Sequence, residues 1–440
     1  MHHSLVAARR RLAFVLPSVP TILVFLAVPA HAAGAAAIDR GNTAWVLVAS
    51  ALVLFMTLPG LGLFYGGLVR ARNLLSVLMH CFAICSIVSV IWLLFGYSLV
   101  FGDSSPLLGG LSKCFLAGIA DNVHRPQIPE YAFVLFQMTF AVITPALTIG
   151  AFTERVRFSF VIGFTVLWLV IVYLPVAHWV WGGGWLAQRG VIDFAGGIVV
   201  HITAGVSALV AAILIGARRG FPHSLIPPHS PGLTMAGGGM LWFGWFGFNG
   251  GSALAADGSA ASAILATHFA AAAASLTWMA IEWLRASKPT SVGLVTGAVA
   301  GLATITPASG YVGPMGALVI GIVAGAACFH VTGFIKQRLR IDDSLDVFAV
   351  HGVGGMVGAL LVAIFALPAL GGVGYASGMS MGRQIAAQAI GVAAAAAWSI
   401  VATFVIVKLL AAVTGLRVSP EEESDGLDLA THGERAYDHG

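Results

Sequence analysis

The sequence predicts an all-α polytopic membrane protein with eleven transmembrane helices, arranged as an inverted five-plus-five helix repeat after a cleaved signal peptide. First, the 440 residues are 58% hydrophobic and 9% charged, whereas soluble domains average roughly 45–50% apolar and about 25% charged residues. Second, apolar stretches of about 20 residues, each long enough to span a bilayer, alternate with short polar loops. Third, many of the 54 glycines fall inside these stretches, where small residues let helices approach closely in lipid.

Residues 1–32 have the composition of a signal peptide. Three arginines, Arg9–Arg11, precede an apolar run from Leu12 to Ala30, and Ala30–Ala32 form an A-x-A cleavage pattern. Prolines inside the run make it a poor permanent span. The alternative is an uncleaved first helix, which would place the start of the chain in the cytoplasm.

The remaining chain is predicted to form a transmembrane domain over residues 33–416, followed by a cytoplasmic tail over 417–440. The predicted spans cover residues 42–66, 74–101, 131–152, 158–178, 195–216, 232–251, 260–284, 292–307, 311–335, 345–367 and 383–413. The first five spans (42–216) and the next five (232–367) make two halves, and the last helix is 383–413. Because five is odd, the second half enters the membrane upside down relative to the first, a common transporter plan.

The basic residues predict the orientation of these spans. Most of them follow the odd-numbered spans, which is typical of the cytoplasmic side. These residues are Arg70, Arg72, Arg155, Arg157, Arg218, Arg219, Arg285, Lys288, Lys336, Arg338, Arg340, Lys408, Arg417 and Arg435. The mature N-terminus is therefore predicted outside and the tail inside. Because the basic residues are scattered over loops, the net charge of +4 does not indicate a nucleic acid partner.

Two histidines in glycine-rich apolar stretches indicate a polar site inside the membrane. His201 follows Asp193, and His351 follows Asp346, at corresponding places in the two halves. An ionisable group at membrane depth costs several kcal/mol, so it is rarely present without a function. We expect the pair to line a pore or a proton relay, against the alternative of two ordinary core histidines. A zinc site needs further ligands, and the HExxH motif is absent, so we predict no metal and no cofactor.

Asp193 and several aromatic residues are the other candidates. As a helix N-cap Asp193 is structural, and as a carboxylate near an outer vestibule it also favours a cation. Aromatic rings in membrane proteins mostly pack in the core or at the interface, but a subset around a vestibule can hold a small cation with about 0.5–2 kcal/mol per ring. The candidates are Phe136, Phe140, Trp181, Trp245, Phe248 and, as a hydrogen-bond acceptor, Ser252.

Several motifs, in order, resemble the ammonium transporter family (Amt/Mep/Rh), and its bacterial Amt branch in particular. They are FYGGLVR (Phe64–Arg70), FQMTFAVITPAL, DFAGGIVVHITAG, GWFGFNGGS, TPASGYVGP and DVFAVHGVGG, within a match from about Asn42 to Tyr437. The resemblance implies a homotrimer in the bacterial inner membrane, with the mature N-terminus in the periplasm and a separate pore in each subunit. It also implies a transporter rather than an enzyme.

The resemblance assigns roles to matching residues. The outer recruitment site for ammonium comprises Trp181, Phe140 and Ser252, with Asp193 supporting the cation. The gate comprises Phe140 and Phe248, with Phe136 and Trp245 nearby. His201 and His351 correspond to the twin-His pair of the narrow pore. For the acidic tail, the resemblance implies docking of a PII signal protein, whereas a simply solvated tail is the other interpretation.

A deprotonation mechanism follows from solvation physics. A bare cation pays an idealised cost of about 20 kcal/mol to enter a low-dielectric region, whereas neutral ammonia loses only hydrogen bonds worth a few kcal/mol. We therefore expect ammonium to bind outside, lose its proton and cross as ammonia, with the proton relayed separately. The alternatives are an ammonium sensor or PII-docking scaffold with little flux, a membrane metal hydrolase or oxidase, and a conductor of methylammonium or carbon dioxide.

Overall fold

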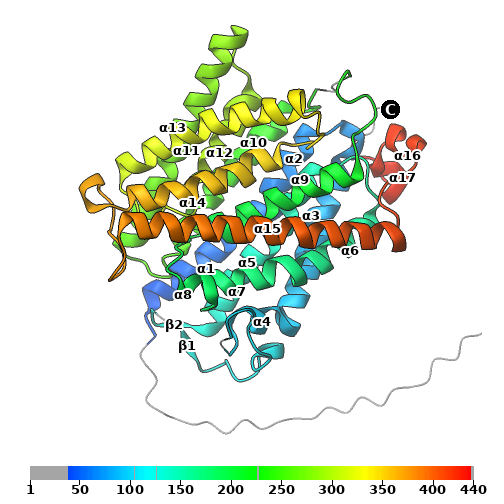
Figure 1. Cartoon of the computed structure of the whole chain (residues 1–440). Helices are drawn as coiled ribbons and strands as arrows, with labels where there is room; N and C mark the ends of the chain where they lie inside the picture. Colours follow the sequence, from blue (N-terminus) through cyan, green and yellow to red (C-terminus); the bar gives the residue numbers. More distant parts are fainter. Residues whose placement is uncertain (1–37, 104, 125, 225–226, 438–440) are drawn as a thin grey trace, which may run out of the picture. The chain divides into compact units, whose positions relative to one another are not determined.

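Helical segments lie at all eleven predicted spans in the computed structural model (Figure 1), which describes residues 38–103, 105–124, 126–224 and 227–437. The predicted signal peptide, residues 1–32, lies outside the described residues. In the first half the segments are α1 (Arg40–Phe55), η1 (Met56–Leu61) and α2 (Gly62–Leu68); α3 (Leu74–Ile91), η3 (Trp92–Gly96) and α4 (Tyr97–Phe101); α5 (Glu130–Thr148); α6 (Phe158–Trp168), η6 (Leu169–Tyr173) and α7 (Leu174–Trp181); and η7 (Gly197–Ile202) and α9 (Thr203–Ile215).

The second half is also helical, and the last helix and the tail follow it. Its segments are α10 (Pro231–Trp245) and η8 (Phe246–Gly250); α11 (Gly258–Ala286); α12 (Ser291–Ile305); α13 (Pro314–Gly333) and η9 (Phe334–Arg338); and η10 (Phe348–Val353) and α14 (Gly354–Phe365). The long helix α15 (Met381–Val413) follows, and then the tail helices α16 (Pro420–Asp425) and α17 (Leu427–His432). The short elements are η2 (Ala71–Asn73), η4 (Cys114–Leu116), β1 (Val123–His124), β2 (Ile128–Pro129), η5 (Ile149–Ala151), α8 (Trp185–Gln188) and η11 (Pro368–Leu370).

Nine segments within the described residues are long and apolar enough to cross a membrane. The helices α10 and α12 have 15 residues each, and α10 continues into η8. At 1.5 Å per residue a helix of that length covers only about 22 Å. The structure therefore indicates a polytopic membrane protein, while the count of eleven crossings stays a prediction.

Wide π-helical turns interrupt many of the helices, including η7, η8 and η10. Such turns are rare and are frequently found at functional sites. His201, Phe248 and His351, three of the residues singled out by the sequence, lie in these three turns.

Small residues let the helices of the second half approach closely. A Cβ atom at Gly301 of α12 or at Gly321 of α13 would lie 2.4 Å from the carbonyl oxygen of Ala270 in α11. Both neighbouring helices therefore approach the backbone of α11 closely at Ala270, as expected for helix packing in lipid.

The tail folds back against the first half of the chain (Figure 1). The carboxylate of Asp428 accepts hydrogen bonds from the backbone N–H groups of Leu75 and Ser76, at 3.1 and 2.7 Å, in the first turn of α3. Asn73 Oδ1 accepts in return from the N–H of Leu427. A residue of the tail therefore provides the acceptor that the N-terminus of α3 needs.

Candidate functional site

The two histidines singled out by the sequence lie face to face, although 150 residues separate them. Both rings are buried. Their Nδ1 atoms are 3.2 Å apart, and the ring centroids are 5.2 Å apart with the planes 18° from parallel. Because one Nδ1 donates to the other, both Nε2 atoms remain for other partners. Within the described residues, Nε2 of His201 is buried and has no hydrogen-bond partner.

Glycine contacts between two helix beginnings hold the imidazoles together. A Cβ atom at Gly205 would lie 2.1 Å from the backbone nitrogen of Gly352. One at Gly355 would lie 2.6 Å from the carbonyl oxygen of Gly197. A larger residue at either position would push the two segments apart, so the glycines beside the histidines are what allow the rings to meet.

A stack of aromatic rings continues from the histidine pair. Trp245 lies 5.5 Å from His201 and is anchored by its Nε1, which donates to Thr306 Oγ1 at 2.9 Å. Phe248 lies 5.6 Å from Trp245, and Phe140 stacks on Phe248 at 4.2 Å and 28°. All three aromatic rings are buried. The two phenyl rings therefore separate the histidine pair from the residues beyond them.

Beyond the phenyl pair lie Trp181 and Ser252, which are half-buried. Trp181 meets Phe140 edge to face at 5.8 Å, and its Nε1 donates to the carbonyl oxygen of Asp193 at 2.9 Å. The hydroxyl of Ser252 donates to the carbonyl oxygen of Phe248 at 2.8 Å, which leaves its own oxygen free to accept. Aromatic faces and a hydroxyl oxygen together suit a small cation that can donate hydrogen bonds.

Phe136 packs against the ring of Phe140. It lies one turn before Phe140 on α5, with the ring centroids 5.0 Å apart, and it is fully buried. The sequence-predicted residues from Trp181 to His351 therefore form one contiguous series.

The carboxylate of Asp193 accepts hydrogen bonds from backbone N–H groups and does not point at a neighbouring side chain. Its Oδ1 accepts from the N–H groups of Gly196 and Gly197, and its Oδ2 from those of Ile198 and Val199, at 2.6–3.0 Å. Burial raises the pKa of the Asp193 carboxyl, and the four N–H donors act in the opposite direction. The carboxylate thus caps η7, the turn that carries His201.

Two cavities meet at His351. One has a volume of about 400 Å³ and extends from His351 to Arg218 and Lys336. The other is a narrow lumen of about 10 Å³ lined by His201, Trp245 and Phe248 among apolar side chains. A single water molecule needs roughly 10–15 Å³, so the lumen is tight and apolar. Within the described part of the chain, no group of three His, Cys, Asp or Glu side chains is placed to hold a metal ion.

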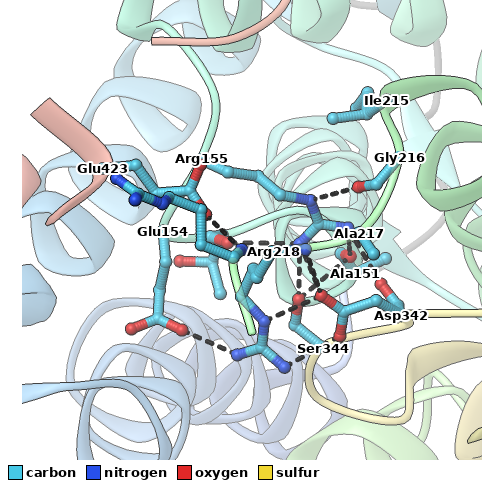
Figure 2. A network of polar contacts seen from close by, with 12 residues as sticks. Ala151, Glu154, Arg155, Ile215, Gly216, Ala217, Arg218, Asp342, Ser344 and Glu423 are labelled. Atoms are coloured by element: carbon cyan, nitrogen blue, oxygen red, sulfur yellow. Dashed lines mark hydrogen bonds and ion pairs between the residues drawn. The ribbon is translucent and has the colours of Figure 1, made fainter. Parts of the chain in front are cut away.

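Figure 2 shows a network of buried charges. One of its members, Arg218, also lines the wide cavity. Arg218 forms ion pairs with Glu154 at 2.6 Å and with Asp342 at 2.8 Å. Burial alone lowers the pKa of Arg218, but Asp342 and Glu154 outweigh it and raise the pKa. Burial raises the pKa of Glu154, yet Arg218 and Arg70 hold it below its ordinary value. These pairs therefore remain charged at neutral pH.

Arg155 is the other centre of this network (Figure 2) and is completely buried. Its guanidinium donates to the carbonyl oxygens of Gly216, Ala151 and Asp342 and to the hydroxyl of Ser344, at 2.6–3.0 Å. The Asp342 carboxylate lies 3.8 Å away. Burial lowers the pKa of Arg155 to about 10, so it keeps its charge at neutral pH. Arg155 thus connects its own loop to the loop that contains Gly216 and to the loop that contains Asp342 and Ser344.

The sequence analysis did not identify this network. It used Arg155 and Arg218 only to predict the orientation of the spans and assigned no role to Glu154 or Asp342. Arg218 is 64 residues from Glu154 and 124 from Asp342, so no local spacing connects them. The only signal in the sequence is that both arginines stand beside predicted span ends.

Comparisons with known proteins agree with the motifs. Residues 44–437 match the model of a family described as the Ammonium Transporter Family. The chain is 46% identical over 403 residues to an ammonium transporter of Bacillus subtilis, covering 91% of this chain and 99% of the relative. It is 47% identical over 414 residues to one of Aquifex aeolicus, covering 92% and 95%.

Solved structures give the same picture. A sensor Amt protein superposes with a TM-score of 0.84 at 35% identity, covering 89% of this chain and 98% of that one. Mep2 of Saccharomyces cerevisiae superposes with a TM-score of 0.79 at 36% identity, covering 87% and 88%.

Proposed function

The chain belongs to the ammonium transporter family, and on that premise we propose that it moves ammonium across a membrane through the lumen lined by His201 and His351. The observation that carries this proposal is the meeting of two imidazoles inside a tight apolar lumen, next to a stack of aromatic rings. A lumen of this kind favours a small neutral molecule that can exchange hydrogen bonds with ring nitrogens.

The substrate enters from the side of Trp181 and Ser252. Ammonium binds there against the faces of Trp181 and Phe140 and donates to the Ser252 hydroxyl. Asp193 contributes by holding Trp181 and η7 in place, which is consistent with its contacts. The phenyl rings of Phe140 and Phe248 form the gate, with Phe136 behind them.

The proton leaves ammonium near the gate. Moving a bare cation into the apolar lumen would cost up to about 20 kcal/mol of idealised Born solvation energy. Ammonia loses only its hydrogen bonds to water, which costs roughly a few kcal/mol. Ammonia then passes Trp245 and the Nε2 atoms of His201 and His351 into the wide cavity. The hydrogen bond between the two Nδ1 atoms offers a separate route for the proton.

We also propose an oligomeric state, a membrane location and a protein partner. The protein is a transporter and not an enzyme, forms a homotrimer of eleven-helix subunits, and resides in a bacterial inner membrane with a periplasmic N-terminus. A PII signal protein docks on the cytoplasmic face, where the tail helices lie. The inverted five-plus-five repeat is supported by the matching positions of η7 and η10.

The test is current measured on a solid-supported membrane carrying the purified protein, after an ammonium jump and then a potassium jump. We expect current for ammonium only. Replacing both histidines, His201→Leu with His351→Leu, should stop the ammonium current or admit potassium, because the lumen then lacks its ring nitrogens. An unchanged ammonium-selective current in this variant would contradict the proposed role of the pair.

A second candidate function is ammonium sensing with little flux, and the likeness to a sensor Amt protein favours it. This function predicts no current in the unmodified protein and no pH change in vesicles after an ammonium gradient is applied. Electroneutral ammonia conduction would also give no current, but it would change the vesicle pH.

A further inference from the structure

We infer that Gln388 of α15 is a positioning residue for the outer ammonium site, and that it acts on Trp181 through the chain segment 190–193. The helix α15 lies outside both predicted halves, and none of the described residues that line the lumen belongs to it. The inference rests on the proposed function, because it concerns the affinity of that site for ammonium.

The side-chain amide of Gln388 is fully buried and uses all of its hydrogen-bonding capacity. Its Oε1 accepts from the backbone N–H of Ile192 at 2.9 Å, and its Nε2 donates to the carbonyl oxygen of the same residue at 2.8 Å. The Nε2 also donates to the carbonyl oxygen of Ala359 in α14, and the Oε1 accepts from Nε2 of Gln384. An amide offers two N–H donors and two acceptor lone pairs, so each one has a partner.

The segment beside this amide needs partners from outside itself. Residues 191–196 form no helix between α8 and η7. Irregular backbone at membrane depth is tolerated only where neighbouring protein groups satisfy its N–H and C=O groups. Gln388 does this for both groups of Ile192. A Cβ atom at Gly391 would lie 3.0 Å from Cγ1 of Val191, so the segment also packs closely against α15.

The same segment leads directly to the outer site. Asp193 follows Ile192, and its backbone carbonyl oxygen accepts from Nε1 of Trp181 at 2.9 Å. The position of the segment therefore determines where the indole ring of Trp181 lies. A ring attracts a cation only from within about 6 Å of its face, so a displaced indole weakens ammonium binding. The histidine pair is held by separate glycine contacts, and we expect passage through the lumen to change little.

The experiment measures current on a solid-supported membrane as a function of ammonium concentration for the unmodified protein and for Gln388→Met. Methionine has a similar length but no amide. We expect the half-saturating ammonium concentration to rise about tenfold, the equivalent of one lost ring contact. The maximal current should stay within about twofold, as when binding alone is weakened. Calorimetric titration with ammonium measures the dissociation constant independently of current.

The matched control is Thr403→Val. Thr403 is another buried residue of α15, and its hydroxyl donates to Oγ of Ser207 at 2.8 Å, away from the segment. This variant should keep the half-saturating concentration of the unmodified protein. If Gln388→Met does not fold, Gln384→Met takes its place. It removes the bond from Gln384 to the carbonyl oxygen of Gly190, and it should shift the half-saturating concentration in the same direction by a smaller factor.

A double variant tests whether Gln388 acts through Trp181. Trp181→Leu should itself raise the half-saturating concentration, and adding Gln388→Met should then change it little, because effects that share one route are not additive. A full additional shift would overturn the inference. An equal shift in Thr403→Val, or a lower maximal current at an unchanged half-saturating concentration, would also overturn it.

Failure of transport can be told apart from failure of this inference. An unmodified protein without ammonium current contradicts the proposed transport alone, and the calorimetric dissociation constant then decides the role of Gln388. An unchanged dissociation constant in Gln388→Met would overturn that role. A protein with neither current nor ammonium binding would contradict both.

Discussion

The histidine pair (His201 and His351) and the charge network (Glu154, Arg155, Arg218 and Asp342) are both buried polar clusters, but they are built in opposite ways. The network is fully charged, and each guanidinium is surrounded by acceptors. The pair is joined by a hydrogen bond between its Nδ1 atoms and leaves Nε2 of His201 without a partner among the described residues. Buried polar groups are normally satisfied, so the network has the character of structure and the pair that of a working site.

This contrast also separates stability from function. Satisfied buried charges fix the positions of loops, and removing one partner leaves the others unpaired. An unsatisfied imidazole contributes little to folding but remains available to a passing molecule. The predictions below compare the two clusters by the free energy of unfolding, measured on the purified protein in detergent.

The largest loss of stability is expected for Arg155→Met. The change removes one of the two guanidinium groups beside the Asp342 carboxylate and leaves several buried carbonyl groups without their donor, so the free energy of unfolding should fall by about 3–5 kcal/mol. Denaturant unfolding measures this value. The control is Arg157→Met, which changes an exposed arginine that donates to the backbone carbonyl oxygens of Arg417 and Thr414. Equal losses in the two variants would remove the distinction claimed for the network.

Asp193→Ala tests the cap of η7, the turn that carries His201. Four buried N–H groups lose their acceptor, so we expect a loss of about 3 kcal/mol. Asp257→Ala is the comparison, because Asp257 is an exposed cap that accepts from only two N–H groups of α11, and its loss should be about 1 kcal/mol. Thermal unfolding of both variants ranks them, and a reversed ranking would contradict the interpretation of Asp193 as a buried cap.

Asp343 gives a smaller effect that depends on pH. Its Oδ2 accepts from the N–H of Phe348 at 2.7 Å, at the start of the turn that carries His351. Burial and the nearby Asp346 raise its pKa to about 6, although Lys336 acts in the opposite direction. The folded state therefore holds this proton more tightly than the unfolded chain.

Stability should accordingly rise as the pH falls from about 6 to about 4, by on the order of 2 kcal/mol, and level off below that range. Asp343→Asn should lack this component, because an amide does not titrate. The measurement is the melting temperature of both proteins between pH 4 and 7.5. Parallel curves would show that another group dominates this range.

The smallest change in stability is expected for the double variant His201→Leu with His351→Leu. Replacing both partners of a buried hydrogen bond by apolar groups of similar size is nearly neutral, so the free energy of unfolding should change by less than about 1 kcal/mol. The same variant should lose ammonium-selective current. A large loss of stability would instead make the pair part of the structural core.

The sequence singled out the two histidines that lie together but not the charge network, for a physical reason. Helical spans can be predicted from local hydropathy. His201 and His351 stand out in the sequence because burying an ionisable side chain in an apolar, glycine-rich stretch is costly. The π-helical turns, however, depend on contacts across the bundle, such as that between Gly205 and Gly352. Arg218 finds Glu154 and Asp342 only after distant loops have come together, so sequence spacing carried no sign of these pairs.

The bond between Asp428 and the first turn of α3 has a consequence for biosynthesis. A ribosome makes Leu75 early and Asp428 more than three hundred residues later, since 353 positions separate them. Until residue 428 has been made, the beginning of α3 lacks this acceptor. A chain cut short before that point therefore carries the defect in its first half.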